Sequence, residues 1–119
     1  MSFPTSPERH AQIVRLRPEK ADEYLDLHER VWPRIEQRLR EAHIRNYTIF
    51  RHGDLLIAYF EYIGIDFDAD MESMAADPVV QEWWTHTDPC QESIEGAEGG
   101  RLWADAAQIW RLGETEEST

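Results

Sequence analysis

One long amphipathic helix pattern constrains the first half of the chain more than any other feature. From about Glu19 to about Glu41, the apolar residues recur at the spacing of one helix face. The residues on this stripe are Tyr24, His28, Val31, Trp32, Ile35 and Leu39. Pro33 interrupts the pattern, and a proline inside a helix removes a backbone hydrogen bond. We therefore expect a bend near Glu29 to Trp32, rather than two separate helices.

The strand signals lie on both sides of this helix. Residues 46–51 and 55–63 are rich in β-branched and aromatic side chains, and a short turn containing Gly53 separates them, which predicts a β-hairpin. The alternating segment 9–17 predicts an earlier strand that ends at Pro18. Residues 102–112 have the composition of a closing strand.

Two shorter helical segments follow the hairpin. The first covers about 66–76, and the second covers about 78–87. Asp77 is placed to cap the second helix, and Pro78 suits its first turn. Residues 89–100 are acidic, contain glycine and show no periodicity, so they are expected to form a connection.

The order strand, helix, strand, strand, helix, strand predicts an α+β protein. We expect a ferredoxin-like β-α-β-β-α-β fold, a four-stranded antiparallel sheet with the helices on one face. It would occupy residues 9–112 as a single domain, between a flexible lead over 1–8 and a disordered acidic tail over 113–119. The hairpin strands carry apolar residues on both faces, so a second subunit is expected to cover the open sheet face of a homodimer.

Charge and cysteine content exclude several classes of function. The chain has 24 acidic and 12 basic residues and a formal charge of -12, which argues against binding nucleic acid or an anionic membrane surface. The single Cys90 excludes an intrachain disulfide and fits a reducing cytoplasm. We expect no secretory signal and no membrane-spanning segment. His43, His52 and His86 lack partners at metal-ligand spacing, so we expect them on the surface and predict no metal site.

Tyr24 and His28 allow two interpretations. They lie one turn apart on the face that should be buried, so His28 is either a core histidine bonded to a backbone carbonyl or a general acid and base. In the second case Tyr24 would orient a hydroxyl or share the proton. Spacing alone leaves both open.

Trp83 and Trp84 are adjacent in the second helical segment. Neighbouring residues on a helix differ by about 100° in direction, so both rings cannot point into one small core. One is expected in the core. The other would line a cavity, where a flat indole face suits the C–H face of a pyranose, or would lie at a dimer interface.

With these residues noted, the chain resembles the L-rhamnose mutarotase family. The resemblance runs from about residue 9 to residue 112 and rests on short motifs. These are Glu23-Tyr24-Leu25-Asp26-Leu27-His28, Val31-Trp32-Pro33, Asn46-Tyr47, Asp77-Pro78 and Trp83-Trp84. After the tryptophan pair, family members usually carry an Asn-Pro-Asp-Asn-Ser-Pro-like loop, whereas residues 88–100 of this chain read differently.

The resemblance implies a small dimeric α/β barrel that interconverts sugar anomers without a cofactor. It implies that His28 is the proton donor, and that Tyr24, Tyr47, Trp83 and Trp84 bind the substrate, a monosaccharide. We therefore expect a cytoplasmic aldose 1-epimerase for L-rhamnose or a related 6-deoxyhexose. A non-catalytic dimeric α/β-barrel module that binds sugars is the alternative, and a cofactor-less oxygenase or haem-degrading protein of the same fold is a third possibility.

Overall fold

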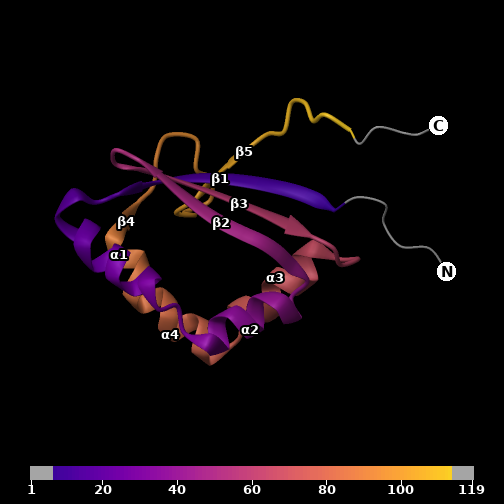
Figure 1. Ribbon diagram of the computed structural model, residues 1–119, viewed down its shortest axis with the longest axis horizontal. Coiled ribbons are helices and arrows are strands. Elements are labelled where there is room, and N and C mark those ends of the chain that lie inside the picture. Colours follow the sequence, from indigo (N-terminus) through magenta and orange to yellow (C-terminus); the bar gives the residue numbers. More distant parts are fainter. Residues whose placement is uncertain (1–6, 114–119) are drawn as a thin grey trace.

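The computed structural model describes residues 7–113 and shows an antiparallel sheet with helices on one face (Figure 1). The elements follow the order β1 (Glu8–Leu16), η1 (Pro18–Lys20), α1 (Ala21–Glu29), α2 (Pro33–Glu41), β2 (Ile44–His52), β3 (Leu55–Tyr62), α3 (Phe67–Ala75), α4 (Pro78–Thr87), η2 (Asp88–Cys90), β4 (Gln91–Glu92) and β5 (Ala104–Ala106). The predicted α+β, ferredoxin-like architecture is confirmed. The flexible lead is expected over 1–8 and the acidic tail over 113–119, and residues 1–6 and 114–119 of these segments lie outside the described residues. Glu8 is already part of β1, so the lead is shorter than expected.

The sheet has the strand order β2-β3-β1, and the outer edge of β1 pairs with two short strands instead of one. β4 pairs antiparallel with Arg15 and Leu16, whereas β5 pairs with the stretch 11–13 of the same strand. The predicted closing strand over 102–112 is therefore wrong in length. The apolar residues Ile109, Trp110 and Leu112 suggested a strand buried in the sheet. They are exposed instead, because the chain has left the edge of β1 before it reaches them.

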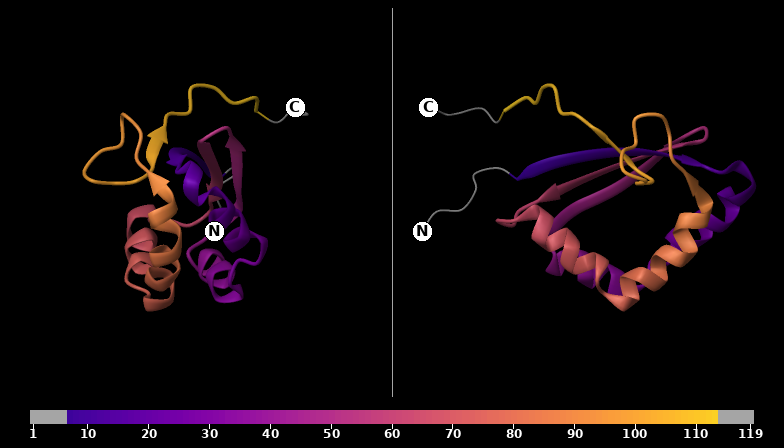
Figure 2. Two further views of the ribbon diagram at one scale, coloured as in Figure 1. Left: turned by 90° about the vertical axis from the view of Figure 1, so that its left-hand side faces the viewer. Right: turned by 180° about the vertical axis from the view of Figure 1, so that it is seen from behind.

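The prediction of one bent helix over 19–41 is also wrong, because α1 and α2 are separate helices. Arg30 has a non-helical backbone at φ -141° and ψ 70°. Pro33 is in the first turn of α2, where its missing N–H needs no partner, and it holds Trp32 at an extended ψ of 132°. The pair α1–α2 lies side by side with the pair α4–α3, and each pair forms a V beneath the sheet (Figures 1 and 2).

The other predicted elements are confirmed. The hairpin of β2 and β3 turns through Gly53, and α3 and α4 occupy the two predicted helical segments. The Asp77 carboxylate caps α4 by accepting a hydrogen bond from the Val79 amide at 2.8 Å. Within residues 7–113, none of the helices has both the length and the apolar character needed to span a bilayer.

The core lies between the sheet and the helices. Alternate residues of β3 face the helices and are buried: Leu56, Ala58, Phe60 and Tyr62. One apolar cluster joins this face to α2, α3 and α4, and a second joins it to α1 and η2. On the open face, Ile57 is half-buried and its neighbour across the ladder, Phe50, is 56% exposed.

Candidate functional site

His28 lies near the end of α1 with one ring nitrogen fixed. Its Nδ1 is 2.9 Å from the backbone carbonyl oxygen of Tyr24. Since a carbonyl oxygen only accepts hydrogen bonds, the proton is on Nδ1, and the lone pair is on Nε2. Burial lowers the pKa of His28, and the bond to the carbonyl opposes that shift in part. At neutral pH the ring is therefore mostly uncharged, and Nε2 can accept a proton.

Aromatic rings from α1 and α4 surround this imidazole. Tyr24 stacks on His28 with the ring centroids 4.2 Å apart, and Trp83 presents its ring at a steep angle, 5.6 Å away. Trp32, at the break between α1 and α2, packs edge-on against Trp83 at 5.1 Å. The site is thus formed where the two V-shaped helix pairs meet, with apolar walls around a single proton-transfer group.

The structure distinguishes the two adjacent tryptophans. Trp83 is buried and contacts His28, whereas Trp84 is 38% exposed. Within the described part of the chain, Trp84 makes no ring contact with Tyr24 or His28. Tyr24, His28 and Trp83 are therefore brought together as the sequence predicts, and Trp84 is not part of that cluster.

Tyr47 joins the site because of a bulge in β2. Ile44 faces the helices, so regular alternation would direct residue 47 to the open face of the sheet. The register with β3 shifts between Arg45 and Thr48, and Asn46 adopts a left-handed backbone at φ 55°. Tyr47 therefore faces the helices and stacks on Phe60 at 5.4 Å.

The two tyrosine hydroxyls lie in a shared, poorly solvated environment. Burial raises the pKa of Tyr47 to about 12, although 40% of the surface of the whole residue is exposed. Burial first, and then the neighbouring Tyr47 hydroxyl, raise the pKa of Tyr24 far above its ordinary value. Both phenols stay protonated at neutral pH and can donate hydrogen bonds.

Gln91 is a site residue that the sequence did not reveal. Its Nε2 donates to the Tyr24 hydroxyl at 3.5 Å, and the side chain is 95% buried, since only 5% of its surface is exposed. The residue reaches Tyr24 through the pairing of β4 with β1, which connects segments far apart in the sequence. No local pattern signals such a pairing. For Tyr47, the asparagine that precedes it was an available signal, because asparagine tolerates a positive φ.

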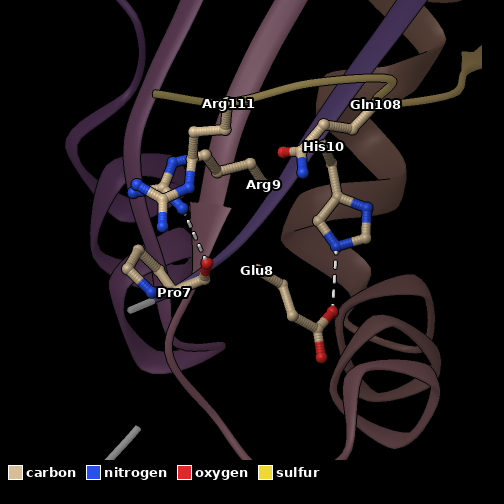
Figure 3. Close-up of a pocket in the computed structure, with 6 residues that line it drawn as sticks. All are labelled: Pro7, Glu8, Arg9, His10, Gln108 and Arg111. Carbon is tan, nitrogen blue, oxygen red and sulfur yellow. Dashed lines mark hydrogen bonds and ion pairs between the residues drawn. The ribbon is translucent and has the colours of Figure 1, made fainter. Parts of the chain in front are cut away.

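Two hollows of the surface lie away from this cluster. One is lined by Arg9, His10, Gln108 and Arg111 where β1 meets the C-terminal segment (Figure 3). Two of its polar side chains are paired locally, since Arg9 donates to the Pro7 carbonyl and His10 Nε2 lies 3.1 Å from Glu8 Oε1. This hollow shares no residue with the cluster around His28. Within residues 7–113, no three His, Cys, Asp or Glu side chains are grouped so that they could hold a metal ion. The predicted surface positions of His43, His52 and His86 are confirmed.

Three comparisons place this geometry among known proteins. The family model described as L-rhamnose mutarotase matches residues 9–112. An L-rhamnose mutarotase of Listeria monocytogenes is 32% identical over 88 residues, covering 72% of this chain and 82% of the relative. An L-fucose mutarotase of Xanthomonas campestris is 33% identical over 86 residues, covering 71% and 68%. The crystal structure of an L-rhamnose mutarotase from Formosa agariphila superposes with a TM-score of 0.69 at 18% identity, covering 89% of this chain and 99% of that one, which shows a shared fold.

Proposed function

The chain belongs to the L-rhamnose mutarotase family, and we propose on that premise that it interconverts the α and β anomers of L-rhamnose, with His28 as the acid and base. Its family consists of isomerases that act on the anomeric centre of a sugar. The observation that supports a role for His28 is the anchored, uncharged imidazole stacked on the protonated Tyr24, whose hydroxyl has the Tyr47 hydroxyl as a neighbour. A related 6-deoxyhexose such as L-fucose is the next substrate to test, because a relative is named for it.

Mutarotation needs one proton to move between two oxygens on the same carbon. In our proposal, Nε2 of His28 takes the proton from the anomeric hydroxyl, and the imidazolium then donates it to the ring oxygen. The bond from C1 to the ring oxygen breaks as the C1 carbonyl forms. Rotation about the C1–C2 bond and the reverse steps close the ring as the other anomer. An acid and base placed in this way accelerates a reaction about 10²- to 10⁴-fold.

The remaining site residues would hold the sugar. Tyr24 and Tyr47 carry protonated hydroxyls that can donate to sugar oxygens, since burial keeps both phenols uncharged. Trp83 offers an indole wall beside His28. Trp84 is proposed as a substrate residue on the resemblance alone, because among the described residues its ring makes no contact with the rings of this cluster. We propose no cofactor for this chemistry, because one imidazole suffices for the proton transfer.

We also propose that two copies pair through the open sheet face. Phe50, Leu55, Ile57 and Tyr59 form an apolar strip on this face, opposite the helices. A self-complementary strip favours a twofold dimer. Sedimentation should give twice the mass of the 14.0 kDa chain, and Ile57→Asp should give the single chain. A monomer for the unaltered protein at micromolar concentration would overturn the dimer.

The experiment that tests the function is saturation-transfer proton NMR on L-rhamnose. One anomeric proton is irradiated, and the signal of the other is followed with and without protein. We expect transfer that depends on the protein, and we expect His28→Ala to abolish it while the circular dichroism spectrum is kept. His52→Ala is the matched control, since His52 is exposed at the end of β2, and it should exchange anomers as the unaltered chain does.

Two results would contradict the proposal. Unchanged exchange by His28→Ala would remove His28 from the mechanism. Absence of transfer for L-rhamnose and L-fucose, together with sugar-dependent quenching of tryptophan fluorescence, would show a binding module instead of an enzyme.

A further inference from the structure

Gln91 lies at the start of β4 and faces the same side of the sheet as the core residues of β1. Its ladder partner is Leu16, which is fully buried against α1. Partners across an antiparallel ladder point to the same face, so the Gln91 carboxamide is directed toward the helices. It meets the Tyr24 hydroxyl there, and the ring that carries this hydroxyl stacks on His28.

The hydrogen bonds of this carboxamide are incomplete. Among residues 7–113, no donor lies within hydrogen-bonding distance of Gln91 Oε1, although that atom is buried. The bond from Nε2 to Tyr24 is 3.5 Å long, at the outer limit for a hydrogen bond. Turning the amide by 180° would let Oε1 accept from the Tyr24 hydroxyl and would place the N–H groups where Oε1 now lies. In the orientation that the structure shows, the Oε1 side of the amide has no hydrogen-bond partner among residues 7–113.

A buried polar atom without a partner destabilises a fold, and native proteins contain few of them. One that lies against a substrate-binding group is suited to a ligand. A sugar hydroxyl both donates and accepts, so it can pair with whichever side of the amide is free. The Tyr24 hydroxyl and the Gln91 amide would then form hydrogen bonds to neighbouring oxygens of one sugar.

We propose that Gln91 is a specificity-determining residue that hydrogen-bonds one ring hydroxyl of the sugar. The identity of the ligand rests on the proposed function.

A purely structural role makes a different prediction. Methionine has nearly the length of glutamine and lacks its polar atoms. If the amide serves the ligand, Gln91→Met removes a buried polar atom that has no protein partner, so the midpoint of thermal unfolding stays the same or rises. If the amide instead supports the fold through Tyr24, the midpoint falls.

The experiment compares the unaltered chain, Gln91→Met and the control Gln12→Met. Gln12 is also a strand glutamine, but its amide is paired with Asp105 at 3.0 Å, outside the site. Each protein is assayed with L-rhamnose and with its 2-deoxy, 3-deoxy and 4-deoxy derivatives. Anomer exchange gives kcat/KM, tryptophan fluorescence gives Kd, and circular dichroism gives the unfolding midpoint.

We expect the unaltered chain to lose roughly 5- to 100-fold with one deoxy sugar, the usual effect of one buried hydrogen bond. Gln91→Met should show that loss already with L-rhamnose, and it should no longer distinguish that deoxy sugar. Gln12→Met should behave as the unaltered chain does. The inference is overturned if Gln91→Met keeps the full discrimination, or if its unfolding midpoint falls while the ratio between sugars stays constant.

The two proposals fail in different ways. If the unaltered chain binds sugars without exchanging anomers, the mutarotase function fails, and the role of Gln91 is still decided by the Kd ratios. If exchange occurs and Gln91→Met does not change the ratios, only the role of Gln91 fails. If no sugar is bound or turned over, both proposals are wrong.

Discussion

Tyr62→Phe tests the interactions that join β3 to α3 and to the turn before β2. Tyr62 is 1% exposed, and its hydroxyl donates to the Asp70 carboxylate at 2.5 Å. The same oxygen accepts from the Asp66 amide at 2.9 Å, and His43 Nδ1 is 3.0 Å from the same carboxylate oxygen. Phenylalanine keeps the ring contact with Phe67 at 5.1 Å, so the substitution removes one oxygen and its two hydrogen bonds.

The expected destabilisation follows from these two bonds. A hydrogen bond to a charged group contributes about 1.5–3 kcal/mol, and one between neutral groups contributes about 0.5–1.5 kcal/mol. The Asp70 side chain is 26% exposed, so water replaces part of the loss, and the lower values apply. We expect a decrease of about 2–3 kcal/mol in the free energy of unfolding. For a chain of this length this lowers the unfolding midpoint by roughly 6–15 °C.

The pH dependence of this difference has a defined sign. The hydrogen bonds from Tyr62 and His43 lower the pKa of Asp70 in the folded chain. A carboxyl group with a lowered pKa stabilises the fold above its unfolded pKa of about 3.9, and this contribution is lost as the pH falls through its folded pKa. The gap between the unaltered chain and Tyr62→Phe should therefore be full at pH 7 and should shrink below about pH 4.

Urea unfolding followed by circular dichroism at pH 7 and pH 3.5 measures both effects. Thr85→Val is the control, because it also removes one hydroxyl, which donates to the Glu82 carbonyl at 2.6 Å on the exposed surface of α4, where solvent replaces the bond more easily. Its effect should stay below about 1 kcal/mol. Equal losses for the two variants, or a gap for Tyr62→Phe that is unchanged at pH 3.5, would refute the reasoning.

Three further predictions concern the site, the thiol and the hairpin. The kcat/KM for anomer exchange, corrected for the spontaneous reaction, should rise with pH through a value below 6.5 and level off by neutrality. The reason is that the proposed base is uncharged His28, whose pKa is lowered by burial, and a decrease over that range would contradict this role. Cys90 is fully buried with a raised thiol pKa, so a thiol-reactive chromophore should label it slowly in buffer and completely in urea, and equal rates would show an open thiol. Gly53→Ala should lower the free energy of unfolding by about 1 kcal/mol in urea titrations, because alanine is strained at the Gly53 φ of +58°. The loss stays small because an added Cβ meets nothing within 4 Å, and no loss would mean that the turn relaxes.

Local patterns were sufficient to predict most of the fold. The hairpin, β1, α3 and α4 each have their own periodicity, turn or cap, and the structure contains all of them. The helix break was missed because Pro33 is compatible both with a kink inside one helix and with the first turn of a new one. In the structure, where Pro33 begins a new helix, Trp32 packs against Trp83. A contact between segments so far apart in the sequence is not visible in a local pattern.

The candidate site was predictable to the extent that it depends on helical spacing. Tyr24 and His28 share a face of α1 by periodicity, so their contact could be anticipated. Which of Trp83 and Trp84 approaches His28 depends on how α4 lies against α1. Tyr47 faces the site only because β2 contains a bulge, and the family resemblance supplied that residue. Gln91 depends on β4, a strand of two residues that has no signature of its own.

The pairing of both β4 and β5 with β1 affects where this protein can accept insertions during evolution. Both strands are paired to β1, so the stretch 93–103 is a loop whose two ends are fixed to one strand. Lengthening a loop has only a small entropic penalty, and neither end of this loop would shift register. Insertions can therefore accumulate beside Gln91 while the sheet and helices stay as they are. With the role that we propose for Gln91, such insertions would alter the contacts to the sugar while the fold stays the same.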